Sequence, residues 1–198
     1  MEKSKVLFVD DDKNLLHALQ RKMRHKYDFE IAIGGQEALR ILMEDGPFAV
    51  CIADMRMPGM DGVKLLTEIG RVSPDTVRMM LTGNADQPTA VEAINRGHIF
   101  RFFSKPCDDE ILEQGINDAI RQYHLITAER DLLEQTLAGS VKVLTDVLAQ
   151  LNPLIFGRSM RVKSWCDMIA RDIGYPQPWE LGLAALLAPI GMVSLPPD

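Results

Sequence analysis

KVLFVDDD, at residues 5–12, joins a short apolar run directly to three aspartates. A second run of the same kind, AVCIAD, occupies residues 49–54. Further short apolar runs lie at 29–33, 76–81 and 100–104. Runs of this length, separated by helical patterns, are typical of a parallel sheet with helices on both faces. The first 105 residues are therefore predicted to form an α/β fold with a doubly wound, five-stranded parallel sheet.

Between the predicted strands, apolar residues recur at helical spacing. They are Leu15, Leu16 and Leu19, then Ala38, Leu39, Ile41 and Leu42, then Leu65, Leu66 and Ile69, and finally Ala90, Val91 and Ile94. Gly34-Gly35 and Pro58-Gly59 are among the turn residues at the junctions. The pattern therefore predicts four helices between the five strands.

After Pro106 the pattern changes to one long helical stretch. From Tyr123 to Leu151, every third and fourth residue is mostly apolar, as in the seam of a coiled coil. Three interpretations stay open. The stretch pairs with a second copy, or Gly139-Ser140 interrupts it and a new module begins, or one amphipathic helix packs on its own chain. Two further helices are predicted at 159–173 and 178–187.

The charge of the chain limits its partners. The formal net charge is -6, and the residues after Gln122 include six basic and eight acidic ones. A nucleic-acid-binding domain needs a basic face, so no DNA partner is expected. No apolar run approaches the length of a membrane span, and the first residues do not form a signal peptide, so a cytoplasmic protein without membrane contact is expected. The three cysteines are scattered, as in reduced thiols.

Polar residues follow the predicted strands at the points where each strand ends. Asp10 and Asp11 follow the first strand, Asp54 the third, Thr82 the fourth and Lys105 the fifth. Open α/β sheets bind ligands at this edge. If the first and third strands are neighbours, the three carboxylates converge, and Mg²⁺ would relieve their repulsion. Carboxylates, Mg²⁺, a hydroxyl and an ammonium together indicate phosphoryl transfer.

The sequence around these positions closely resembles the receiver domain of two-component response regulators, over about residues 4–122. The matching segments are VDDD at 9–12, DMRMPGMDG at 54–62, LTG at 81–83 and SKP at 104–106. The resemblance implies that Asp54 is the phosphoacceptor and receives a phosphoryl group from a histidine kinase or a phosphotransfer protein. It also implies that Asp10, Asp11, Asp54 and the backbone carbonyl of Arg56 bind Mg²⁺.

The same resemblance implies a switch. Thr82 would bond a phosphoryl oxygen and Lys105 would pair with another. Phe102 occupies the family's aromatic switch position and would rotate into the space that Thr82 leaves. The family also has a cis peptide at the position of Lys105-Pro106. An aromatic residue in a final strand is equally compatible with a plain core role for Phe102.

The C-terminal segment resembles the opening part of HD-type phosphohydrolases, in particular the HD-GYP-like enzymes that cleave cyclic di-GMP. NPLIFGRSMRV at 152–162 and AALLAPIG at 184–191 carry this resemblance. Where the active pattern has metal-binding His and His-Asp, this chain has Arg158, Ala188 and Pro189. Alanine and proline side chains offer no ligand atom, and arginine would repel a divalent ion. The segment is therefore predicted not to be an enzyme.

These observations predict a response regulator with a receiver domain at 1–122, a helical connector at 123–139 and a partial HD-like output segment at 140–198. A homodimer through the connector and a downstream protein partner are expected. Two alternatives remain: a regulator of a cyclic di-GMP phosphodiesterase whose output domain is truncated here, and a bare phosphorelay receiver with a dimerising tail. An unrelated helical tail also fits 140–198. The chain is expected to be a fragment that ends within its second domain.

Overall fold

The computed structural model describes residues 3–83, 99–151, 153–175 and 178–188. They belong to two compact units, Met1–Ala128 and Glu129–Asp198. In the described part of the chain, no helix is long and apolar enough to cross a membrane.

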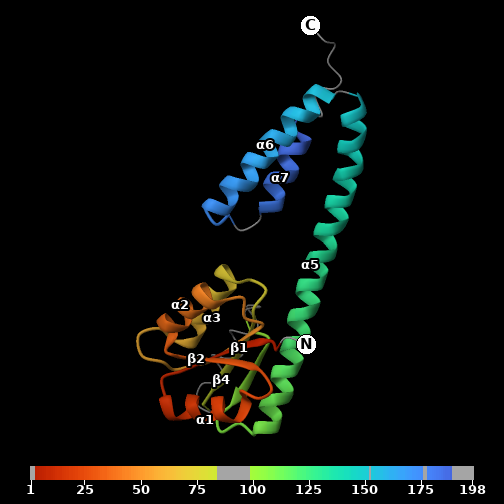
Figure 1. Ribbon diagram of the computed structural model, residues 1–198. Helices are drawn as coiled ribbons and strands as arrows, with labels where there is room; N and C mark the ends of the chain where they lie inside the picture. Colours follow the sequence, from red (N-terminus) through yellow and green to blue (C-terminus); the bar gives the residue numbers. More distant parts are fainter. Residues whose placement is uncertain (1–2, 84–98, 152, 176–177, 189–198) are drawn as a thin grey trace. The chain divides into compact units, whose positions relative to one another are not determined.

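The first unit is built on a five-stranded parallel sheet with the strand order β2-β1-β3-β4-β5 (Figure 1). Its strands are β1 (Lys5–Asp10), β2 (Asp28–Ile33), β3 (Val50–Asp54), β4 (Val77–Thr82) and β5 (Arg101–Ser104). All five predicted strands are confirmed, with boundaries that shift by one residue at most. β1 and β3 are neighbours, as the convergence of the acidic residues requires.

Helices cover both faces of this sheet because both faces of its strands are apolar. In β1, Val6 and Phe8 face one core cluster, which includes residues of α1 (Lys13–Met23) and of the first part of α5 (Asp109–Leu151). Leu7 and Val9 face the opposite cluster with α2 (Gly35–Asp45) and α3 (Gly62–Val72). The prediction of a doubly wound sheet is confirmed. The predicted helix around Ala90, Val91 and Ile94 lies outside the described residues.

Two aspartates near the sheet edge begin helices. The Asp12 carboxylate accepts hydrogen bonds from the backbone N–H groups of Asn14 and Leu15 and caps α1. The Asp61 carboxylate accepts from the N–H of Lys64 and caps α3. Such caps satisfy N–H groups that have no partner within the helix. These two acidic residues therefore have a structural role.

Polar contacts join three successive turns of α5 to α1 and to the residues that follow α1. Lys22 pairs with Asp109 and Lys26 with Glu113, and the Tyr27 hydroxyl donates to Asn117 Oδ1 at 2.8 Å. The α5 partners recur every four residues and so share one face of the helix. Beneath them Leu112, Ile116 and Ala119 are buried in the core. The first turns of α5 are thus fixed to the receiver-like sheet unit.

The helix α5 continues without a break for 43 residues, through Gly139 and Ser140. The Ser140 hydroxyl donates to the carbonyl oxygen of Thr136 at 2.9 Å, within the helix itself. The interpretation that Gly139-Ser140 interrupts the helix is therefore wrong. The division at 122 and 139 stays a prediction, since α5 spans both positions.

In the second unit, α6 (Pro153–Asp172) packs beside α7 (Pro178–Leu187) (Figure 1). Both predicted helices are confirmed, but α6 begins earlier than Ser159, because Pro153 suits the first turn of a helix. Gly174 has a φ of 62° and ends α6. The Gly174 N–H donates to Arg171 O and the Tyr175 N–H to Ala170 O, the pairing of a glycine-terminated helix.

Candidate functional site

Four side chains that the sequence singled out meet at the carboxyl edge of the sheet. Asp10, Asp54 and Thr82 are the last residues of β1, β3 and β4, and Lys105 follows β5 directly. Asp10 is 1% exposed, Asp54 7% and Thr82 0%. The carboxyl ends of parallel strands lie at the same edge of the sheet, so the last residues of β1, β3 and β4 lie close together there.

The Lys105 ammonium is the centre of this cluster. Its Nζ lies 2.7 Å from Asp10 Oδ2 and also forms an ion pair with Asp54 Oδ1. The remaining oxygens are held by the backbone: the Arg56 N–H donates to Asp54 Oδ2 at 2.8 Å, and the Asp12 N–H donates to Asp10 Oδ1 at 2.9 Å. Two buried carboxylates therefore share one ammonium, and the group keeps a net negative charge.

The electrostatics of the cluster follow from burial and from this sharing. Burial raises the pKa of Asp54, and the nearby Asp10 carboxylate adds to the effect, whereas Lys105 opposes it. Burial by itself lowers the pKa of Lys105, but its bonds to Asp10 and Asp54 more than offset this and leave the pKa above its usual value. Lys105 therefore stays protonated between the two carboxylates.

Thr82 and the end of β5 complete the site. The Thr82 hydroxyl lies 3.4 Å from Met55 Sδ and 3.1 Å from the carbonyl oxygen of Gly83, and it is buried. The Lys105 N–H donates to the Thr82 carbonyl oxygen at 2.8 Å, which joins the ends of β4 and β5. Phe102 is half-buried against the cluster that includes Met55. The expected cis peptide at Lys105-Pro106 is present.

The oxygens at this edge fit a hard divalent cation. The Asp10 and Asp54 carboxylates are oxygen donors that lie within reach of one ammonium, and Mg²⁺ prefers oxygen ligands. Asp11 is exposed beside them. Among the described residues, no group of three or more His, Cys, Asp or Glu side chains is arranged to hold a metal. The predicted ligand set of Asp10, Asp11, Asp54 and the Arg56 carbonyl therefore stays a prediction.

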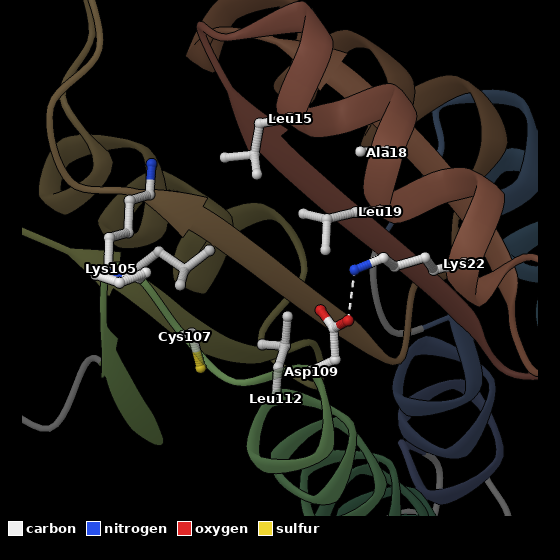
Figure 2. Close-up of a pocket in the computed structure, with 10 residues that line it drawn as sticks. Leu15, Ala18, Leu19, Lys22, Lys105, Cys107, Asp109 and Leu112 are labelled. Carbon is white, nitrogen blue, oxygen red and sulfur yellow. Dashed lines mark hydrogen bonds and ion pairs between the residues drawn. The ribbon is translucent and has the colours of Figure 1, made fainter.

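Sequence reasoning did not anticipate two features beside the site. One is the contact between the Thr82 hydroxyl and Met55, the residue that follows β3. The other is a pocket of about 230 Å³ between α1 and the start of α5. Figure 2 shows Leu15, Leu19 and Leu112 as its apolar walls, with the Lys22–Asp109 ion pair at its edge. The sequence did contain a signal for this neighbourhood of α1 and α5. Lys22 and Lys26 are four residues apart, as are their ion-pair partners Asp109 and Glu113.

Comparisons with known proteins agree with this geometry. The family model described as "Response regulator receiver domain" matches residues 6–117. The transcriptional regulatory protein GlrR of Escherichia coli (strain K12) is 39% identical over 126 residues, which cover 63% of this chain and 28% of that protein. The chain thus spans well under a third of that relative.

Solved structures match the same part of the chain. A crystal structure of adenylate cyclase from Rhodopirellula baltica is 41% identical with a TM-score of 0.65, and it covers 66% of this chain and 97% of that one. The signal receiver domain of an HD domain-containing protein from Pseudomonas fluorescens Pf-5 is 32% identical with a TM-score of 0.58, and it covers 62% of this chain and 98% of that one.

These matches bear on two expectations about the output. They give the HD-type resemblance of 140–198 no support, because the family model ends at residue 117 and the Pseudomonas structure is a receiver domain. The name of the E. coli relative describes transcriptional regulation, which runs against the expectation of no DNA partner.

Proposed function

This chain belongs to the response regulator receiver family through residues 6–117, and we propose that it is a regulator phosphorylated on Asp54. The phosphoryl donor in this proposal is a partner histidine kinase or phosphotransfer protein in the cytoplasm. The observation that carries the proposal is the shared ammonium: Lys105 Nζ bonds both Asp10 and Asp54 at the carboxyl edge of the sheet. A buried carboxylate held by a cation at a ligand-binding edge is suited to phosphoryl transfer.

The nucleophile in this proposal is a carboxylate oxygen of Asp54. It forms the new P–O bond while the P–N bond to the partner's imidazole breaks, and the electron pair of that bond stays on the imidazole nitrogen. The Arg56 N–H holds the other oxygen, Oδ2, in place. Lys105 already lies at Oδ1 and remains near enough to pair with an incoming phosphoryl oxygen. The protein is thus a phosphoacceptor and needs no catalytic domain of its own.

Asp10, Asp11, Asp54 and the Arg56 carbonyl would hold Mg²⁺, which when bound neutralises charge on the transferred group. Asp10 is fixed for this task by the Asp12 N–H and by Lys105. Asp11, exposed at the rim, would complete the oxygen set. The chain's own part is to keep these oxygens oriented and Asp54 away from bulk water.

The response begins at Thr82 and Phe102 in this proposal. The added phosphoryl group carries a charge of about -2 and offers strong acceptor oxygens. The Thr82 hydroxyl would exchange its weak contact with Met55 Sδ for one of these oxygens. Half-buried Phe102 would then turn inward toward the vacated space. Because Lys105 N–H bonds Thr82 O, a shift of Thr82 also reaches the end of β5.

The signal would leave through α5, which is continuous into the second unit. Its predicted seam is exposed at Leu133, Leu137, Leu144 and Val147, so it is free to pair with a second copy. The second unit acts in this proposal as a non-catalytic interaction segment for a downstream protein; its HD-like character stays a prediction.

Mass spectrometry after incubation with acetyl phosphate and Mg²⁺ tests the core proposal. The wild-type chain should gain one phosphoryl group, Asp54→Asn should gain none, and chelation of Mg²⁺ should prevent the gain. Asp61→Asn is the matched control, because asparagine also caps helices and Asp61 lies in the same loop. Absence of the adduct in wild type, or its persistence in Asp54→Asn, contradicts the proposal.

A further inference from the structure

The outward face of α6 is apolar along most of its length. Away from the buried Ser159 and Ala170, four large side chains within about 120° of one another on the helix surface are between 42% and 57% exposed: Val162, Trp165, Met168 and Ile169. Soluble proteins seldom leave apolar residues together on one helix face without a partner. Tryptophan is also the residue most characteristic of interface centres.

Two opposite charges flank this face at equal distances from Trp165, and a further exposed arginine, Arg161, lies on the face between Arg158 and Trp165. Arg158 lies seven residues before Trp165, and Asp172 lies seven residues after it. With about 100° of rotation per residue, all three fall within about 40° of one another on the helix surface. Both charged residues are exposed, and neither forms an ion pair within the part of the chain that the structure describes.

We propose that α6 pairs antiparallel with α6 of a second copy of this chain, about a two-fold axis at Trp165. In an isologous pair, a residue a given number of positions before the axis faces the residue the same number after it in the partner. Trp165 then meets its own equivalent, and Val162 meets Met168. Arg158 of each copy faces Asp172 of the other, so two ion pairs close the ends of an apolar stripe.

The charges favour a second copy over an unrelated protein as the occupant. The face is complementary to itself when reversed, since its basic end meets its acidic end. A parallel pair would instead place Arg158 against Arg158 and Asp172 against Asp172, which costs free energy at both ends.

This surface is separate from the proposed function. The α6 surface does not involve Asp54. The two-fold axis of an antiparallel α6 pair runs perpendicular to α6, whereas the two-fold axis of a parallel α5 pair would run along the helices. The two interfaces are therefore distinct, and a chain that uses both forms an assembly larger than a dimer.

Charge reversal tests the pairing, with the mass of the full chain measured by light scattering over a range of concentrations. Arg158→Asp should place two acidic groups together and raise the dissociation constant about tenfold or more, as should Asp172→Arg. The double variant Arg158→Asp with Asp172→Arg restores both ion pairs and should restore the wild-type mass. Arg171→Asp is the matched control, because it makes the same charge change on the same helix about 140° away from Arg158.

Trp165→Ala should weaken the pair as well, and circular dichroism checks that α6 stays folded in every variant. A wild-type chain that is monomeric at all concentrations overturns the proposal. Masses that ignore both single reversals overturn it too, as does a double variant that stays dissociated. Leu144→Asp in the α5 seam separates the two interfaces: if only that variant lowers the mass, pairing through α5 stands and pairing through α6 fails.

Discussion

The two units, which join between Ala128 and Glu129, differ in how far their apolar side chains are buried. The first buries two core clusters, one on each face of its sheet. In the described part of the second, the buried apolar residues are Val141, Ala170 and Ala185, while apolar side chains from Leu132 to Tyr175 lie exposed. Burial of apolar area is the main favourable term in folding. The first unit therefore has an apolar core on each face of its sheet, whereas the described part of the second unit leaves most of its large apolar side chains exposed.

The same contrast holds for charged groups. In the first unit, the buried carboxylates of Asp10 and Asp54 both pair with half-buried Lys105, and this pairing offsets the cost of burying their charge. In the second unit, Arg158 and Asp172 remain at the surface. Buried charged groups are typical of catalytic and ligand-binding sites. Charged groups on an exposed apolar face instead contribute to the specificity of protein association.

The largest effect should come from the sheet core. Phe8 is fully buried and stacks on Phe29 with 6.0 Å between ring centroids, so Phe8→Ala should lower the free energy of unfolding by about 3–5 kcal/mol. Val143→Ala, at a position 64% exposed in the second unit, should change it by less than about 0.5 kcal/mol. Urea unfolding followed by circular dichroism measures both. Equal losses would mean that the two units are packed alike.

A smaller loss is expected where α5 crosses the sheet unit. A Cβ atom on Gly115 would lie 2.3 Å from Cζ of Phe103, which is buried. Relief of that contact requires the ring or the helix to shift, so Gly115→Ala should destabilise the first unit by about 1–3 kcal/mol. The urea midpoint of that unit is the measurement. An unchanged midpoint would show that α5 is held loosely on the sheet.

The buried carboxylate of Asp54, the proposed phosphoacceptor, should lower the stability of the fold at neutral pH. Since burial raises the pKa of Asp54, the folded state holds its proton to higher pH than the unfolded state does. The resulting stabilisation is complete below the unfolded pKa, about 4, and is lost as the pH rises through the folded value. Asp54→Asn should therefore be more stable than wild type at pH 7, by about 1 kcal/mol, and should lack this decline.

The control for this pH dependence lies in the second unit. Asp131 is exposed on α5, and Asp131→Asn should stay within about 0.5 kcal/mol of wild type at every pH from 4 to 8. Thermal unfolding at several pH values measures both variants. If Asp54→Asn is the less stable protein at pH 7, the attraction of Lys105 outweighs burial at this site.

The sequence was most informative where residue type and strand position coincide. Asp10, Asp54, Thr82 and Lys105 could be placed because a short apolar strand ends at or just before each of them. The neighbouring positions of the first and third strands were only a condition of that prediction, and the structure supplied them. The sharing of one ammonium could not be predicted, since it depends on side-chain reach across three strands. Pro153 was a usable signal for the start of α6, but it lies in a segment that resembled another family.

Gly139 shows most clearly where prediction from the sequence fails. Glycine and serine together indicate the end of a helix, yet α5 continues through both residues. Helix propensity is a local preference of less than about 1 kcal/mol, and neighbouring turns of a long helix override it. Val141 and Thr145, which are buried just beyond this point, show that tertiary packing holds these turns.

The smallest effect is therefore expected at Gly139, and it should have the opposite sign to that at Gly115 in the same helix. Among the described residues, no atom lies within 4 Å of a Cβ built on Gly139, so Gly139→Ala adds no clash with them and removes only the conformational freedom of glycine. The second unit should gain about 0.5–1 kcal/mol, measured as a higher urea midpoint and greater helicity. A loss instead would mean that a surface outside the described part of the chain, such as that of a second copy, approaches the α5 backbone at Gly139. The same substitution thus tests a closely packed position of α5 at Gly115 and an open one at Gly139.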